Sequence, residues 1–153
     1  VVVVHPDLID EPAVLQGIDW TLGIENMDWR KTTAQFPDQL TPWFEHYPKA
    51  TMVLDMNHCY TNDRSMVLAG ALWEKFSDRM HSIHLSAFGG AERPHMPFHT
   101  SSCDDIIKAL PTLDVAIILE VGVGQLSPQE VATEYAYVLS KIRLYHHLDT
   151  VLG

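Results

Sequence analysis

The sequence predicts an α/β fold of the (β/α)8 TIM-barrel type, and three observations support this prediction. Short apolar runs of the kind that forms buried strands recur along the chain. Stretches with helical spacing or helix-capping residues separate several of them. The runs end on residues that can bind a metal or transfer a proton, namely His5, Glu25, Asp55, His84 and Glu120. Because the C-terminal ends of the strands of such a barrel meet at one mouth, we expect these side chains to converge there.

Length and composition indicate a single globular domain spanning residues 1–153. The chain has 153 residues, of which 46% are hydrophobic, so it can bury a sizeable core. No apolar run approaches the ~20 residues that cross a bilayer, and we expect no membrane association. The formal net charge of −10 disfavours nucleic acid as a partner. Cys59 and Cys103 lack paired spacing and no signal peptide precedes them, which predicts reduced thiols and a cytoplasmic location.

We predict strands at residues 1–4, 21–25, 50–55, 81–85 and 115–121. The last is a near-continuous run of Val, Ile and Leu, as in strands buried on both faces of a parallel sheet. Side chains alternate between the two faces of a strand, so Val53 should share a face with Asp55, and Gly23 with Glu25. Gly23 would leave room below that carboxylate.

The helices are predicted from caps and spacing. Residues 41–47 should be helical, with Pro42 in the first turn. Asn62 or Asp63 can cap a second helix, in which apolar residues recur every four positions. Residues 103–110 should form a short helix. Ser127-Pro128-Gln129-Glu130 has the pattern of a capping box, and the helix it opens is expected to bury Val131, Tyr135, Val138, Leu139 and Ile142.

His58 follows Asp55 by three residues, so the two cannot share one face of a strand. His58 reaches the mouth only if the chain has turned out of the strand by Asn57. We therefore expect His58 on the rim, beside a metal or behind its ligands.

Five strands do not close a barrel of eight. The chain starts within a strand, with four valines and no initiator Met. We expect either that three βα units are missing or that another chain supplies them, as a partner or in a homo-oligomer. An open sheet with two bare edges would otherwise favour aggregation.

The spacing of the polar residues resembles that of one superfamily. The relevant segments read VVVVHPD, LGIENMD, VLDMNHCY, SIHLSAFGG, ERPHMP and IILEVG. This set is similar to the xylose-isomerase-like TIM barrels, which include sugar phosphate isomerases and epimerases and the endonuclease IV group. The resemblance covers nearly the whole chain. It implies that the chain corresponds to about the fourth to eighth βα units of such a barrel, its C-terminal portion.

The resemblance also implies a divalent metal centre with the ligands Glu25, Asp55, His84 and Glu120. Glu25 and Glu120 would in addition be the catalytic pair that removes and returns a proton next to a carbonyl. Substrate or a second metal would be bound by His5, His58, Arg93 and His95. Three carboxylates and one imidazole favour Mn²⁺, Mg²⁺ or Co²⁺, and the neighbouring histidines allow Zn²⁺.

These expectations describe a metal-dependent isomerase or epimerase acting on a sugar or sugar phosphate in carbohydrate metabolism. An endonuclease IV-like phosphodiesterase acting on abasic DNA is one alternative, because the same ligands serve both. The nuclease group, however, has Asp-x-His where this chain has Arg93-Pro94-His95, and the net charge is negative. A non-catalytic partial-barrel subunit is the other alternative, although a scaffold gives no physical reason to place so many charged groups at one mouth.

Overall fold

A computed structural model of the chain describes residues 1–15, 17–122 and 126–147. In this part of the chain, five strands form one parallel sheet in the order β1-β2-β3-β4-β5. The strands are β1 (Val2–Val4), β2 (Leu22–Glu25), β3 (Thr51–Asp55), β4 (Met80–Leu85) and β5 (Ala116–Leu119). All five predicted strands are confirmed, and the predicted α/β class with them. The expectation that the last strand is buried on both faces is wrong, because the residues of β5 alternate between exposed and partly buried.

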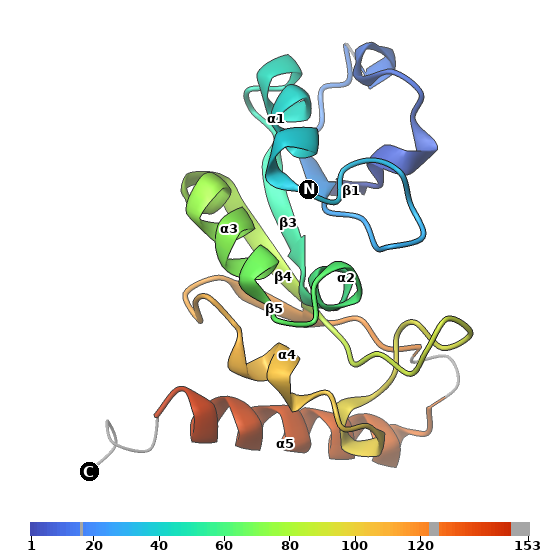
Figure 1. Cartoon of the computed structure of the whole chain (residues 1–153), viewed down its shortest axis with the longest axis vertical. Coiled ribbons are helices and arrows are strands. Elements are labelled where there is room, and N and C mark those ends of the chain that lie inside the picture. Colours follow the sequence, from blue (N-terminus) through green and yellow to red (C-terminus); the bar gives the residue numbers. More distant parts are fainter. Residues whose placement is uncertain (16, 123–125, 148–153) are drawn as a thin grey trace.

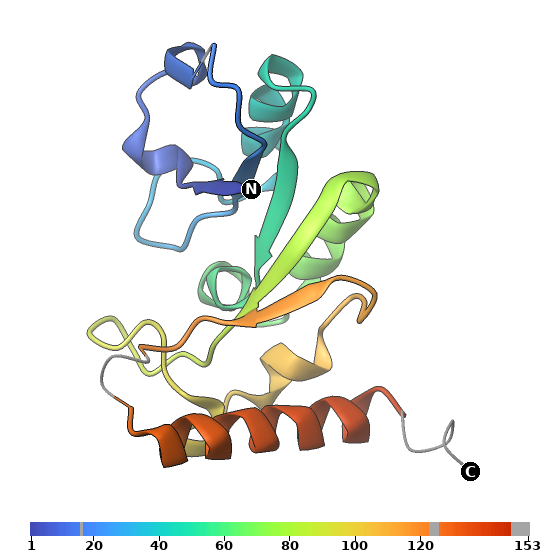
Figure 2. The same ribbon diagram turned by 180° about the vertical axis from the view of Figure 1, so that it is seen from behind.

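Strands that are neighbours in the sheet are also consecutive in the sequence, so the sheet has no reversal of order. An open doubly wound sheet reverses its strand order at a switch point, whereas a barrel wall does not. The strands twist strongly from β1 to β5 (Figure 2). Sequential order and twist are compatible with a section of a barrel, and β1 and β5 are the two edges of the sheet.

The helices cover one face of this sheet. They are α1 (Pro37–His46), α2 (Met56–Asn62), α3 (Val67–Phe76), α4 (Asp104–Lys108) and α5 (Pro128–Tyr145). Figure 1 shows α1 and α3 on the same side of the strands, and α4 between β5 and α5. Between the helices and the sheet lies a buried apolar core that includes Leu40, Met52, Leu54, Leu72 and Ile83. No helix in the described ranges is long and apolar enough to cross a membrane.

The face of the sheet that the helices do not cover carries every second residue of each strand. Gly23 pairs with Thr51, and Glu25 with Val53, as the predicted alternation requires. A Cβ atom on Gly23 would lie 2.8 Å from Cγ1 of Val1 and 2.9 Å from Cγ2 of Val53. Glycine is therefore required here for the strands to approach, which confirms the prediction that Gly23 leaves space below Glu25.

An irregularity in the pairing of β3 with β4 decides which way His84 points. Met52 pairs with Met80, but the next residue, Val53, pairs with Ser82, so the register shifts by one residue. Such a bulge reverses the facing of all following residues. As a result His84 pairs with Asp55 and lies on the same face.

Three helix predictions need correction. α1 begins at Pro37 and contains Pro42 in its interior, four residues earlier than predicted, because Pro37 occupies the first-turn position. The residue Met66, not Asn62 or Asp63, is the N-cap of α3, although Asp63 accepts the N–H of Leu68 with Oδ2. The segment after Asp55 is helical (α2), where only a turn was expected.

The predicted capping box of α5 is confirmed, since Ser127 and Glu130 bond reciprocally. The predicted buried face is wrong in part: Val138 is buried, but Val131 and Tyr135 are exposed. Glu134 takes their place in the interior and accepts the N–H groups of Phe98 and His99 at 2.8 and 3.1 Å. A charged residue on the inward face misleads any assignment based on hydrophobic periodicity.

Candidate metal centre

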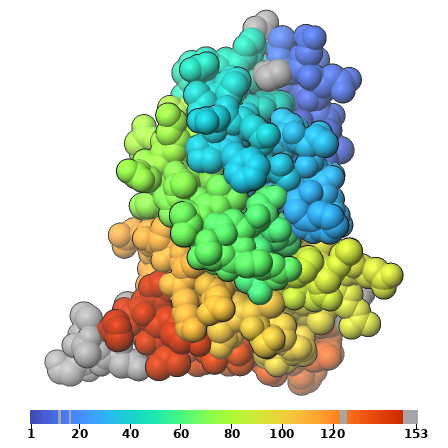
Figure 3. Space-filling view, in the orientation of Figure 1, coloured from blue at the N-terminus to red at the C-terminus, as the bar shows by residue number. Residues whose placement is uncertain are grey.

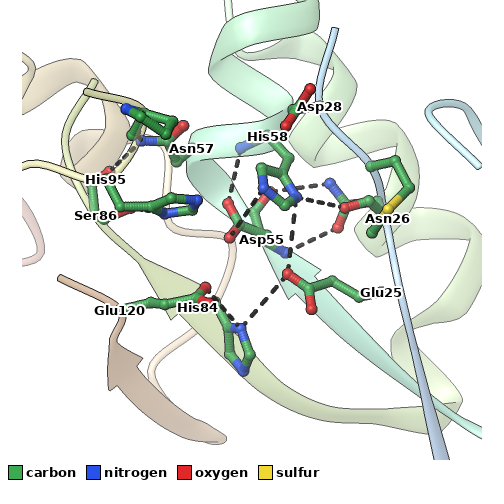
Figure 4. Close-up of polar contacts among 12 residues, drawn as sticks. Glu25, Asn26, Asp28, Asp55, Asn57, His58, His84, Ser86, His95 and Glu120 are labelled. Carbon is green, nitrogen blue, oxygen red and sulfur yellow. Dashed lines mark hydrogen bonds and ion pairs between the residues drawn. The ribbon is translucent and has the colours of Figure 1, made fainter. Parts of the chain in front are cut away.

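Four side chains from consecutive strands meet at the C-terminal edge of the sheet. They belong to Glu25, Asp55, His84 and Glu120, and one possible ligand atom of each lies within 4.8 Å of the others. Figure 4 shows these side chains pointing toward one another. The first three are buried, and Glu120 is partly exposed. The structure thus brings together the complete ligand set that the sequence suggested.

Asp55 both ends β3 and caps α2. Its Oδ1 atom accepts the backbone N–H of His58 at 2.8 Å. Asn26 fixes the same point, because its side-chain amide accepts the N–H of Asp55 at 2.8 Å and donates to the Asp55 carbonyl at 3.0 Å. The carboxylate is therefore held rigidly, and Oδ2 is left buried without a hydrogen-bond partner among the described residues.

Glu25 is held in a similar way. Its Oε2 atom lies 3.1 Å from Nε2 of His5. Its Oε1 atom is buried and has no hydrogen-bond partner in the described part of the chain. The nearest imidazole atoms to Oε1 are Nδ1 of His84 at 3.6 Å and Nδ1 of His58 at 3.7 Å, both beyond normal hydrogen-bond length.

This arrangement fits a divalent cation. Buried carboxylate oxygens almost always have a partner, so two orphaned oxygens in one cluster call for an explanation. The unpaired atoms Glu25 Oε1 and Asp55 Oδ2, with His84 and Glu120, offer three carboxylates and one imidazole. A cluster of buried Glu, Asp and His side chains that could bind a metal is therefore present.

The groups of the cluster perturb one another's ionisation. Burial disfavours the charge on Glu25, but contact with His5 and His84 prevails and lowers its pKa to about 2. Burial and then the charge of Glu25 raise the pKa of Asp55 well above its usual range. Burial disfavours the charge on His84, yet Glu120 and Glu25 together raise its pKa to about 10. The spread of these pKa values follows from packing several acids and one imidazole into a small buried volume.

Three more histidines line the same mouth. His5 bonds Glu25, as described above, and is about half-exposed. His58, predicted to reach the rim, is brought there by α2, and its Nδ1 atom lies 2.7 Å from the carbonyl oxygen of Asn26. The rings of His58 and His95 meet edge to face, with centroids 5.5 Å apart. Figure 4 shows His58 and His95 beside the four candidate ligands.

His95 is carried by the loop between β4 and α4. Its Nδ1 atom lies 2.9 Å from the Ser86 hydroxyl. The side chain of Asn57, at the start of α2, donates to the carbonyl oxygens of Ala87 and Pro94 at 2.8 Å each. The backbones of Ala87 and Met96 exchange two hydrogen bonds. This loop is therefore fixed by hydrogen bonds to the start of α2 and to the residues that follow β4.

Arg93 occupies the tip of that loop. Its backbone N–H bonds Gly90 and its backbone carbonyl accepts the N–H of Gly89. Its side chain is exposed. In the described part of the chain, no hydrogen bond or ion pair joins the Arg93 side chain to the cluster, whereas His5 bonds Glu25.

Three residues were not predicted from the sequence. Asn26 positions the end of β3, Asn57 positions the loop that carries His95, and Arg30 pairs with Asp28. Asparagine directly after a strand is common in turns, so nothing in the sequence distinguishes these residues. Arg30 follows Asp28 by two residues, and this spacing is the only signal that could have suggested an ion pair.

Comparison with models of known protein families and with curated proteins returns no match for this chain.

Proposed function

We propose that the chain is the metal-binding part of a (β/α)8-barrel enzyme that isomerises or epimerises a sugar or sugar phosphate. One observation carries the proposal: four consecutive parallel strands each deliver one ligand to one point, where two buried carboxylate oxygens have no partner among the described residues. The proposed family is the xylose-isomerase-like superfamily, on the resemblance of the segments that hold these residues.

The chemistry follows from the ligand set. A divalent ion held by Glu25, Asp55, His84 and Glu120 would polarise the carbonyl and hydroxyl oxygens of a hydroxy-ketone and so acidify the adjacent C–H. Glu25 and Glu120 approach the site from β2 and from the end of β5, with β3 and β4 between them. One carboxylate removes the proton and the other returns it. The contact of His5 with Glu25 orients the first carboxylate.

Asp55 and Asn26 have a positioning role. Asn26 fixes the end of β3 through two hydrogen bonds, and Asp55 caps the helix that carries His58. A shift of either residue would displace the end of β3 and the start of α2, and with them the carboxylate of Asp55 and the ring of His58. His58 and His95 then face the substrate side of the cluster as hydrogen-bonding groups.

Hydrogen exchange tests the proposal. The metal-loaded protein is incubated in D₂O with a panel of ketoses and ketose phosphates, and exchange of the α-hydrogen is followed by NMR. We expect a Glu25→Gln variant that retains metal to lose exchange by roughly 10²- to 10⁴-fold, the contribution of a positioned base. Glu45→Gln, on the exposed surface of α1, is the matched control and should leave exchange unchanged.

One observation favours a second candidate, an endonuclease IV-like phosphodiesterase. His5, His58 and His95 surround the same mouth, and a cluster of several metals needs additional imidazoles. The same samples are therefore given duplex DNA that contains an abasic site. Metal-dependent incision without exchange on any sugar would replace the isomerase by the nuclease, and failure of both reactions would favour a non-catalytic partial-barrel subunit.

A further inference from the structure

The loop that follows β2 is firmly built. The backbone N–H of Met27 donates to the carbonyl of Ala34 at 2.8 Å and closes the loop. Asn62, at the end of α2, donates to the carbonyl of Met27 at 2.8 Å. Gln35 donates to the carbonyl of Asp28 and to the side chain of Asn62, at 3.0 Å each. This loop, residues 26–35, therefore presents its side chains from a fixed backbone.

Arg30 is fixed within this loop by Asp28. The guanidinium Nε atom lies 3.1 Å from Oδ1, and one terminal nitrogen lies 2.6 Å from Oδ2. The backbone N–H of Arg30 also donates to Oδ1 at 2.7 Å. The Asp28 side chain is buried, whereas that of Arg30 is 40% exposed. The ion pair thus consists of a buried carboxylate, which holds the arginine in place, and a guanidinium group that is partly open to solvent.

The guanidinium group of Arg30 has N–H donors that Asp28 does not engage. A guanidinium group has five N–H donors, and Asp28 engages one on Nε and one on a terminal nitrogen. The remaining three have no hydrogen-bond partner among the described residues. Two of them lie on the edge formed by the two terminal nitrogens, which has the geometry that binds two oxygens of a phosphate or carboxylate.

Arg30 faces the loop that carries His95, one of the histidines beside the candidate metal centre. Asp28 and Arg30 line a narrow crevice whose other wall includes Asn57 and Pro94, and Pro94 directly precedes His95. Burial lowers the pKa of His95, and against the neighbouring carboxylates the charges of His58 and Arg30 lower it further. In Figure 3 the light-blue segment around residue 30 lies on the same side of the molecule as the yellow-green loop that carries His95, and Figure 4 shows Asp28 close to His58.

We propose that Arg30, held by Asp28, binds an oxyanion at the far end of the substrate, so that the enzyme prefers a ketose phosphate or a ketose acid to a neutral ketose. This inference rests on the proposed function. The net charge of the chain is −10, and the metal would engage the reacting end of the substrate, so a cationic side chain such as Arg30 is needed to hold an anionic group at the far end. Phosphate esters and carboxylates share the chemistry that Arg30 recognises.

Binding measurements on the full chain loaded with Mn²⁺ test this inference. The ligands are ketoses from tetrulose to hexulose, each as the neutral sugar, the terminal phosphate ester and the terminal carboxylate, and affinity is measured by calorimetry. We expect at least one anionic form to bind about tenfold or more tightly than its neutral parent, since a charge-assisted bidentate contact supplies that much. Arg30→Gln should remove this preference, and Arg30→Lys should restore only part of it.

Two controls separate recognition from folding. Because Arg30→Gln leaves the buried Asp28 carboxylate without a positive charge beside it, the double variant Asp28→Asn with Arg30→Gln is measured in parallel and should also lose the preference. Arg143→Gln, which removes an exposed arginine of α5, should keep it. Mn²⁺ affinity should be the same in all variants, which reports an intact metal centre.

The outcomes distinguish the two proposals. An anion preference that is absent from the wild type, or that survives in both Arg30→Gln variants, overturns the role of Arg30, whatever the exchange assay gives. An Arg30-dependent preference supports it. If that preference is found while no ketose exchanges hydrogen, the anion site stands and the isomerase function fails.

Discussion

The backbone N–H of His58 engages one oxygen of the Asp55 carboxylate and leaves the other free to bind a cation. Its Oδ1 atom accepts the backbone N–H of His58 at 2.8 Å and caps α2, while Oδ2 is buried without a hydrogen-bond partner in the described ranges. A strand-end Asp is often only a helix cap, and here capping leaves the second oxygen available for a cation. The two residues of the Asp-x-x-His segment therefore act together, because Asp55 caps α2, the helix that carries the imidazole of His58.

Replacing Asp55 by Asn separates these two roles. The Asn side chain still accepts the N–H of His58 and keeps the cap, but it lacks the negative charge. We expect Mn²⁺ affinity to fall by about 10- to 100-fold, whereas the metal-free protein melts at the same or a higher temperature, because a neutral amide replaces a carboxyl group whose ionisation burial disfavours. Asp55→Ala should lose both metal affinity and about 1 kcal/mol of stability. Calorimetric titration and thermal denaturation measure the two effects, and unchanged metal affinity in both variants would contradict the assignment.

Gly23→Ala tests the close approach of the strands below Glu25. The added Cβ would lie within 3 Å of side-chain atoms of Val1 and Val53. Overpacking of this kind costs about 1–3 kcal/mol in the free energy of unfolding. Chemical denaturation should show this loss, and the second substitution Val53→Ala should recover part of it. Additive losses in the double variant would mean that the two side chains do not compete for space.

The sequence predicted some parts of this architecture because single strands carry their own signal. Apolar runs that end at Glu25, Asp55 and His84 are visible locally, and their convergence follows from parallel strands. The facing of His84 was predicted correctly, but the register shift that pairs it with Asp55 could not be, since it depends on how two strands meet. The inward position of Glu134 on α5 was equally hidden, because its partners lie in a distant loop.

Asp104 should make stability depend on pH. Burial opposes its ionisation, but hydrogen bonds from Lys141, Tyr137 and Tyr145, which tie α4 to α5, lower its pKa in the folded protein. A lowered folded-state pKa adds stability above the unfolded-state pKa of about 4, and this contribution is lost as the pH falls through the folded-state value.

The pH effect is measured as a difference between variants. Asp104→Asn should be less stable than the wild type by up to about 1 kcal/mol at neutral pH, because solvent partly screens the ion pair with Lys141. The difference should shrink below about pH 4. Asp105→Asn, on the exposed side of α4, is the matched control. A difference for Asp104 that stays constant down to pH 2 would show that its charge is not the cause.

The open face of the sheet should promote self-association. Val1 is 55% exposed and Ile118 is 46% exposed, at opposite edges of the sheet. Edge strands with apolar side chains pair readily with other chains. Sedimentation should reveal concentration-dependent oligomers, which Val3→Lys on β1 reduces and Val67→Lys on the exposed surface of α3 does not. A monomer at all concentrations would show that the five strands are sufficient by themselves.

Anomalous diffraction from crystals of the intact protein grown with Mn²⁺ tests the central claim most directly. We predict one strong peak, with carboxylate oxygens of Glu25, Asp55 and Glu120 and one ring nitrogen of His84 at about 2.0–2.4 Å. The peak should disappear in Asp55→Asn crystals grown under the same conditions. A peak at another place in the molecule, or none at saturating Mn²⁺, would contradict a metal centre at the C-terminal ends of these strands.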